Sequence, residues 1–160
     1  MLQGVKRRGV QKLNLMREAA KGRWLTGVAE SKKAGLILAG WFEAWADATF
    51  ATDPVGAAST PPVLRAPNGV VADGREFWSA GKLLYDPADI RVPTFLAHAE
   101  WDADLPSYML YAYFEKLVNA PYKRYVQIRE GTHTVIMEKN RMQLFQAVQQ
   151  FFDEKEQGGQ

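Results

Sequence analysis

Two strand-like segments, residues 92–98 and 123–128, flank one helix-like segment, and this order limits the available folds more than any other feature. The first is an unbroken apolar run ending in His98, which is typical of a strand buried on both faces. Ser107 then occupies an expected helix N-cap, and apolar side chains follow at helical spacing: Leu110, Tyr111, Phe114, Leu117 and Val118. A strand–helix–strand unit requires parallel strands and a right-handed crossover. We therefore predict an α/β fold in which the two strands pair in parallel.

Polar side chains follow both predicted strands. Asp102 lies in the turn after the first strand, and His133 follows the second. Parallel strands finish at one edge of a sheet, where open α/β folds usually bind ligands. A carboxylate bonded to one imidazole nitrogen fixes the tautomer and stabilises the imidazolium. The sequence therefore predicts an acid–base pair of Asp102 and His133, although a lone loop histidine is more often an ordinary surface residue.

Other side chains near the first strand leave alternatives open. Asp104 is a rival for the acid, and His98 is expected to pack in the interior with a ring nitrogen bonded to the main chain. His98, Glu100, Asp102 and Asp104 also alternate, so a continuing strand would offer nitrogen and oxygen ligands on one face. Pro106 and the helix after it favour a turn instead, so we expect no metal and no cofactor.

The run Val92-Pro-Thr-Phe-Leu-Ala-His-Ala-Glu-Trp-Asp102, with Pro106 and then Gly131-Thr-His133, resembles the C-terminal part of an α/β-hydrolase. The resemblance covers roughly residues 24–154 and is strongest over 91–137. It implies a partial three-layer fold in which Asp102 and His133 are the acid and base of a Ser-His-Asp-type triad acting on an ester or other acyl bond. Ala99 replaces the usual glycine of the acid turn, a departure from the family pattern.

No Gly-x-Ser-x-Gly nucleophile elbow occurs in the chain, and Ser79 is a poor substitute because no strand precedes it. Since a two-stranded parallel unit leaves open sheet edges, we expect this C-terminal fragment to be inactive alone, to form a homo-oligomer, or to need a complementing N-terminal half. The alternatives are a non-catalytic protein-interaction module of the same fold and a small metal-dependent hydrolase at Asp102 and Asp104.

The resemblance also implies a helical cap and predicts a single, incomplete domain over 1–160. Its expected parts are a basic N-terminal segment, cap-like helices, a turn-rich return and a C-terminal core, at residues 1–23, 24–58, 59–91 and 92–154. An aromatic cap suggests an apolar, ester-like small-molecule substrate, with three tryptophans as candidate contacts: Trp41, Trp45 and Trp101. A tryptophan stripe is more often simply core.

Three further elements are expected from local patterns. Ser31 is a candidate cap for a helix that continues through Trp41 and Trp45. Residues 63–64 and 70–71 flank Asn68-Gly69 and could form a small hairpin, although Pro67 argues against a regular one. Residues 75–84 and 136–152 are expected to be helical, the latter with an apolar stripe that packs on the sheet.

Composition excludes several classes of protein. The chain has 160 residues, 47% of them hydrophobic, which suits one globular domain. It contains no cysteine, so disulfides and thiolate sites are impossible, and this fits a cytoplasmic protein. Residues 1–33 hold nine Lys or Arg against two Glu, but no aromatic platform accompanies them, so we expect no nucleic-acid binding. Glu43 and Asp47 interrupt the most apolar stretch, so no membrane span is expected.

Overall fold

The computed structural model of the protein describes residues 12–15 and 17–157. The chain divides into two compact units, each assembled from two stretches of sequence. Unit 1 comprises Met1–Ala20 and Trp45–Leu84, and unit 2 comprises Lys21–Ala44 and Tyr85–Gln160. Most of the basic segment 1–23, namely residues 1–11 and 16, lies outside the described residues. The expectation of a single domain with internal boundaries stays a prediction.

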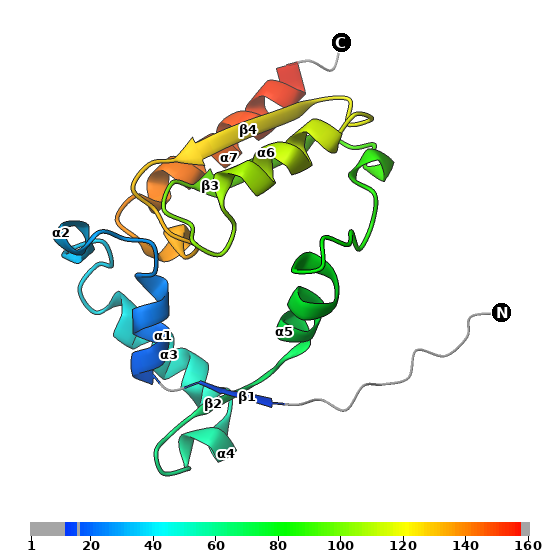
Figure 1. Cartoon of the computed structure of the whole chain (residues 1–160). Helices are drawn as coiled ribbons and strands as arrows, with labels where there is room; N and C mark the ends of the chain where they lie inside the picture. The colour runs from blue at the N-terminus through cyan, green and yellow to red at the C-terminus, as the bar shows by residue number, and fades with distance from the viewer. Residues whose placement is uncertain (1–11, 16, 158–160) are drawn as a thin grey trace. The chain divides into compact units, whose positions relative to one another are not determined.

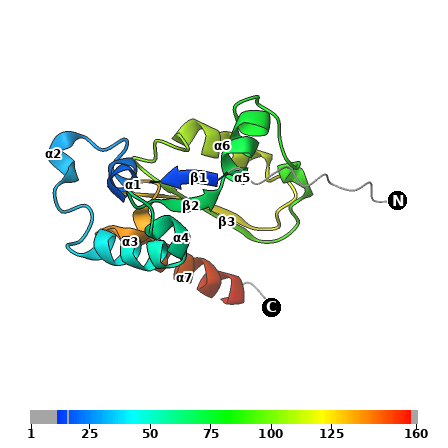
Figure 2. The ribbon, with the colours of Figure 1, turned by 90° about the horizontal axis from the view of Figure 1, so that it is seen from below.

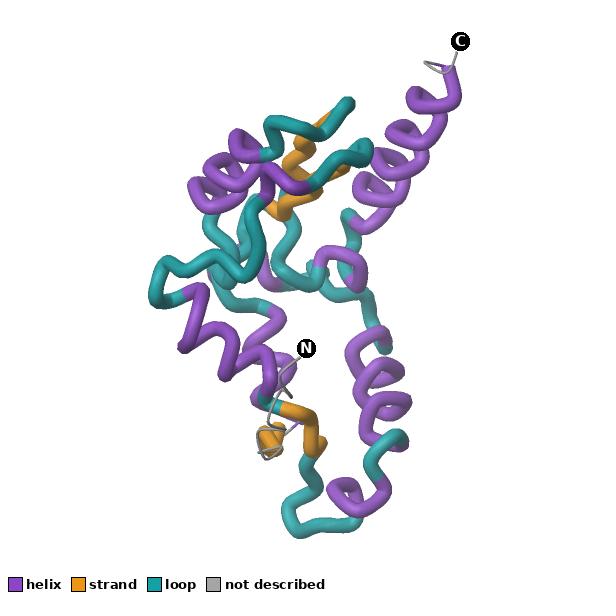
Figure 3. Tube along the Cα trace, turned by 90° about the vertical axis from the view of Figure 1, so that its right-hand side faces the viewer, coloured by secondary structure: helices purple, strands orange, loops and turns teal. Residues whose placement is uncertain are grey.

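The described residues form a mixed α/β structure in which helix and loop predominate and the strands are short (Figure 3). In chain order the elements are β1 (Lys12–Leu15), α1 (Arg17–Trp24), α2 (Glu30–Lys33), α3 (Trp41–Ala51), α4 (Pro54–Ala57), β2 (Leu64–Pro67), α5 (Gly69–Asp73), η1 (Gly74–Trp78), η2 (Pro87–Asp89), β3 (Thr94–Ala99), α6 (Ser107–Lys116), β4 (Lys123–Ile128), η3 (Val135–Met137) and α7 (Arg141–Gln157). Within this part of the chain, no helix combines the length and the apolar character needed to cross a membrane.

Unit 2 is built around the parallel pair β3–β4, which confirms the predicted pairing. The register runs from Thr94 opposite Lys123 to Ala99 opposite Ile128. β3 begins two residues later than predicted, because Pro93 has no N–H for a ladder and Val92 is exposed. The second strand has the predicted bounds.

Helices α6 and α7 cover opposite faces of this pair, as Figures 1 and 2 show. On one face Tyr125 packs against Tyr111 and Phe114 of α6, with ring centroids 4.9 and 6.0 Å apart. On the other face Phe95 meets Phe151 of α7 at 5.4 Å. Side chains alternate along each strand, and the register pairs Phe95 with Arg124 and Tyr125 with Leu96, so Phe95 and Tyr125 lie on different faces. The two-stranded sheet therefore has a core on both faces.

The segment that precedes this core in sequence is not the long helix predicted from Ser31. Gly35 and Gly40 have φ values of +74° and +78°. Because these left-handed conformations interrupt a helix, α2 and α3 are separate elements. Between them Ile37 forms an antiparallel bridge with Glu138. The helical spacing of the apolar residues instead reflects one short turn followed by a new helix at Trp41.

Unit 1 contains the antiparallel pair β1–β2, with Leu13 opposite Ala66. The hairpin predicted around Asn68-Gly69 is wrong, because its first arm pairs with residues 12–15 and its second arm is the helix α5. Asp53 caps α4 at Gly56 and accepts hydrogen bonds from the side chain and main chain of Arg65. The bond from the Arg65 guanidinium holds the pKa of Asp53 far below its usual range.

Three helix boundaries also differ from the sequence prediction. Ser107 is the first residue of α6 rather than its N-cap, which is Pro106, and no side chain caps this end. The helix expected over 136–152 is divided into η3 and α7, because the chain turns extended at Glu138 before Arg141 begins the long helix. Of the helix expected over 75–84, only the π-helical turn η1 forms.

Candidate functional site

Two loops leave the carboxyl ends of β3 and β4, and main-chain hydrogen bonds join them. We call residues 100–106 the acid loop and residues 129–134 the base loop. The Glu100 N–H donates to the Ile128 carbonyl over 2.9 Å, which extends the ladder past the strands. The Trp101 N–H then donates to the Gly131 carbonyl over 2.8 Å. The parallel pairing therefore continues into the loops and sets their spacing.

Asp102 and His133 are brought together by this arrangement. His133 Nδ1 lies 3.0 Å from Asp102 Oδ2. The other carboxylate oxygen, Oδ1, accepts the main-chain N–H groups of Asp104 at 2.9 Å and Leu105 at 3.0 Å. The Asp102 side chain is 8% exposed, whereas that of His133 is 51% exposed. The acid is thus fixed inside its own loop, and the base faces solvent.

The geometry assigns the tautomer of His133. A carboxylate can only accept, so Nδ1 carries the proton of this bond. The lone pair of the neutral ring is therefore on Nε2, for which the described residues provide no hydrogen-bond partner. An imidazole oriented in this way can take a proton at Nε2 while the carboxylate stabilises the charge that forms.

Asp104, the rival acid, has a different partner. Its Oδ2 accepts from Arg23 Nη2 over 2.6 Å, so it forms an ion pair with the C-terminal turn of α1. Its main-chain N–H is one of the two that donate to Asp102 Oδ1. Of the two carboxylates, only Asp102 is bonded to His133 within the described residues.

His98 is buried in the interior, as expected, and is 4% exposed. Its Nε2–H donates to the Leu105 carbonyl over 2.9 Å, because a carbonyl can only accept. Nδ1 then accepts the hydroxyl of Tyr125 over 3.1 Å. Burial, together with the neighbouring Tyr111, raises the pKa of Tyr125 to about 12. His98 therefore fixes the C-terminal end of the acid loop through its bond to Leu105.

The four alternating donors considered for a metal each meet a different partner. Glu100 accepts the main-chain N–H of Glu130 over 2.9 Å, and the other three are bonded as described above. In residues 12–15 and 17–157 no three His, Asp or Glu side chains gather in a way that could hold a metal ion. The backbone turns at Trp101 and Asp102, so the donors do not continue along one strand face.

The three tryptophans proposed as substrate contacts lie in different settings. Trp101 is half-buried, and its main chain joins the acid loop to the base loop. The ring of Trp41 is covered by the guanidinium of Arg141, 4.1 Å from its centroid. Trp45 belongs to unit 1, whereas the acid–base pair belongs to unit 2. Their contact with substrate stays a prediction.

A polar cluster beneath the base loop was not predicted from the sequence. The carboxylate of Glu138, which is 0% exposed, accepts the N–H and hydroxyl of Thr132 and the hydroxyl of Thr134. The two threonines flank His133, which is visible in the sequence. Glu138 itself resembles any acidic residue shortly before a helix, so its burial could not be anticipated.

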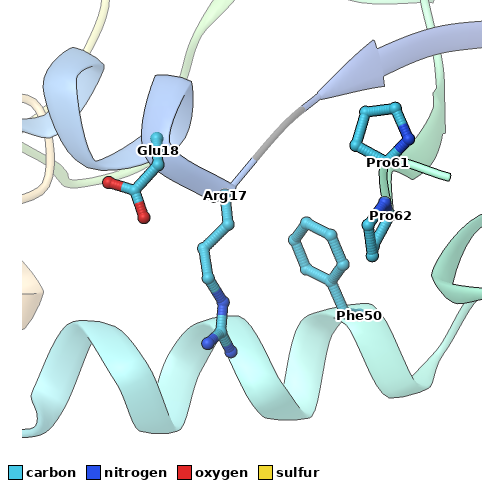
Figure 4. A pocket seen from close by; sticks show the side chains of 5 residues that line it. All are labelled: Arg17, Glu18, Phe50, Pro61 and Pro62. Atoms are coloured by element: carbon cyan, nitrogen blue, oxygen red, sulfur yellow. The ribbon is translucent and has the colours of Figure 1, made fainter.

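Unit 1 contains a separate hollow with a volume of about 380 Å³ (Figure 4). Phe50, Pro61 and Pro62 form its apolar wall, and Arg17 and Glu18 of α1 line the remainder. Arg17 is paired with Asp47 of the same unit. The hollow is therefore mainly apolar, with its cation already neutralised.

The arrangement in unit 2 can perform general acid–base chemistry. One ring nitrogen of His133 is held by a buried carboxylate, and the other is available for a proton. Neither loop contains a serine, and the two hydroxyls of the base loop, on Thr132 and Thr134, are bonded to Glu138.

No family model, no curated protein and no solved structure matches this chain.

Proposed function

We propose that the chain is the C-terminal portion of an α/β-hydrolase-type enzyme that hydrolyses an ester or similar acyl bond. Asp102 would be the acid and His133 the base of a Ser-His-Asp-type triad. The observation that carries the proposal is the 3.0 Å bond between these side chains, on adjacent loops at the carboxyl ends of parallel strands. The resemblance of residues 91–137 to that family supports the same assignment.

In the proposed reaction Asp102 keeps the Nδ1–H of His133 in place, and Nε2 removes a proton from the attacking hydroxyl. The imidazolium is stabilised by Asp102 and then returns the proton to the leaving group. Since the chain contains no Gly-x-Ser-x-Gly, the attacking hydroxyl would belong to water or to another chain. The oxyanion donors would likewise come from that partner.

The partner in this proposal is a second copy or a complementing N-terminal half. A sheet of two strands leaves unpaired N–H and C=O groups along its edges. The helix α6 also exposes large side chains: Tyr108 is 71% exposed and Tyr111 49%. Exposed large side chains and open sheet edges are both typical of a protein interface.

The test is turnover of a short-chain p-nitrophenyl ester by wild type and by His133→Ala, alone and with the complementing half where it can be supplied. The proposal predicts that His133→Ala lowers kcat/KM by about 10²–10⁴-fold, the range for loss of a general base. Asp104→Asn is the matched control and should retain wild-type turnover, because Asp104 pairs with Arg23. Equal turnover by wild type and His133→Ala would contradict the proposal, because the ester would then be hydrolysed without the general base.

The same open edges favour a second candidate, a non-catalytic protein-interaction module of this fold. Such a module would bind its partner equally well with and without the imidazole of His133, and neither chain nor complex would turn over ester. Light scattering and ester turnover on the same His133→Ala sample therefore separate the two functions.

A further inference from the structure

We infer that Glu138 is the positioning residue of the base loop: it holds His133 in the orientation that bonds Asp102. This inference rests on the proposed function for its catalytic meaning, although the contacts it invokes lie outside the acid–base pair itself. It assigns a role to a carboxylate that neither the family resemblance nor the acid–base pair accounts for.

The first support is the burial of Glu138. Its side chain is 0% exposed, and in the described part of the chain no cationic side chain forms an ion pair with it. A buried carboxylate is costly unless hydrogen bonds satisfy it. Glu138 obtains them from one short stretch of chain, the base loop.

The second support is where those donors lie. Oε2 accepts the Thr132 N–H over 3.0 Å, and Oε1 accepts the hydroxyls of Thr132 and Thr134, the latter over 3.1 Å. These are the residues immediately before and after His133. Because the Glu138 carboxylate bonds both neighbours of His133, it fixes the main chain of His133 and therefore the direction of its Cα–Cβ bond.

The third support is that Glu138 is itself anchored. Its main chain bridges Ile37, and the next N–H, of Lys139, donates to the Leu36 carbonyl over 2.9 Å. Leu36 is fully buried. Glu138 thus links the base loop to the buried core. His133 itself is half-exposed, and among the described residues its side chain bonds Asp102 alone.

The test is the ring spectrum of His133 by ¹H–¹⁵N NMR, a readout that needs no turnover. Wild type should show an Nδ1–H resonance shifted downfield by the Asp102 bond, and Asp102→Asn assigns it by removing it. In Glu138→Ala we expect this resonance to be lost while the ring signals of buried His98 remain. Glu130→Gln is the matched control, since Glu130 pairs with Lys32 and Lys139 rather than with either threonine, and it should keep the resonance.

A second pair of variants decides the matter if Glu138→Ala does not fold. Thr132→Ser keeps the hydroxyl that reaches Glu138, and Thr132→Val removes it at nearly constant volume. The inference predicts the His133 resonance in Thr132→Ser and its loss in Thr132→Val. A resonance retained in folded Glu138→Ala, or in Thr132→Val, would overturn it. Failure of ester turnover in wild type would count against the proposed function alone, because the ring signal would still report on positioning.

Discussion

The main-chain N–H of Trp101 donates to the carbonyl of Gly131, so the acid loop and the base loop are joined one residue before Asp102 and two before His133. A main-chain bond leaves no side-chain freedom at the junction. The distance between the two functional side chains is therefore determined by the register of β3 and β4, which carry the loops.

Gly131→Ala should strain this junction. A Cβ at Gly131 would lie 2.6 Å from Cγ2 of Val135 and 3.5 Å from Cβ of Ala99, so the loop would have to shift. We expect a loss of about 1–3 kcal/mol in the free energy of unfolding, the usual cost of an overpacked site. Gly22→Ala is the control: its Cβ meets nothing within 4 Å in the helix α1, and it should stabilise by about 0.5–1 kcal/mol. Urea unfolding of both variants measures the contrast, and equal effects would contradict it.

Asp102→Asn should reverse the tautomer of His133. The asparagine amide can donate to Nδ1, which moves the ring proton to Nε2 and removes the lone pair that accepts a proton. Ring ¹⁵N shifts should then exchange their pattern, and any ester turnover should fall by about 10⁴-fold. Asp104→Asn is expected to leave both unchanged, because Asp104 bonds Arg23. If the ring proton stayed on Nδ1 in Asp102→Asn, the bond from Asp102 would not be what sets the tautomer of His133.

Leu117→Ala should destabilise unit 2 strongly. Leu117 follows α6 and is 0% exposed, so truncation leaves a cavity, and comparable changes cost about 2–5 kcal/mol. Its neighbour Val118 is 68% exposed, and Val118→Ala should change stability by less than about 0.5 kcal/mol. Urea unfolding of both variants measures the two effects, with the change in midpoint converted to free energy where the m-value is unchanged. A small effect at Leu117 would show that this end of α6 is not packed.

Glu130 should make stability depend on pH in the acid range. Hydrogen bonds from Lys139 and Lys32 lower the pKa of Glu130 below its usual value of 4.5. A lowered folded-state pKa stabilises the fold above the unfolded value, and this contribution is lost as pH falls through the folded value. Wild type and Glu130→Gln should therefore differ in unfolding free energy near neutrality and converge below pH 4.5. If the two unfolding free energies still differed below the folded-state pKa, the contribution of Glu130 would come from packing and not from its charge.

The parallel strands were predictable because their apolar runs are short, unbroken and separated by a clear helical pattern. The same reasoning predicted that Asp102 and His133 would meet, since parallel strands end at one edge. It could not choose firmly between Asp102 and Asp104. That choice depends on Arg23, which is 81 residues away in sequence and reaches Asp104 only in the folded unit.

Two of the errors share a physical cause. The predicted helix from Ser31 and the hairpin at Asn68-Gly69 were both inferred from neighbours in sequence. In the structure Ile37 bridges Glu138, and residues 64–67 pair with residues 12–15, so long-range partners override local propensity. The burial of Glu138 was hidden for a related reason: its carboxylate bonds the nearby Thr132 and Thr134, but its main chain bridges Ile37, which is distant in sequence.

The hydroxyl oxygen of Thr132 also lies 2.9 Å from the carbonyl oxygen of Trp24, across 108 positions of sequence. Because synthesis proceeds from the N-terminus, Trp24 leaves the ribosome 108 positions before Thr132, so the nascent chain holds one half of this contact before the other exists. The acid–base pair is likewise completed only after residue 133 has emerged, so a chain that stops between residues 103 and 132 contains the acid yet never assembles the site.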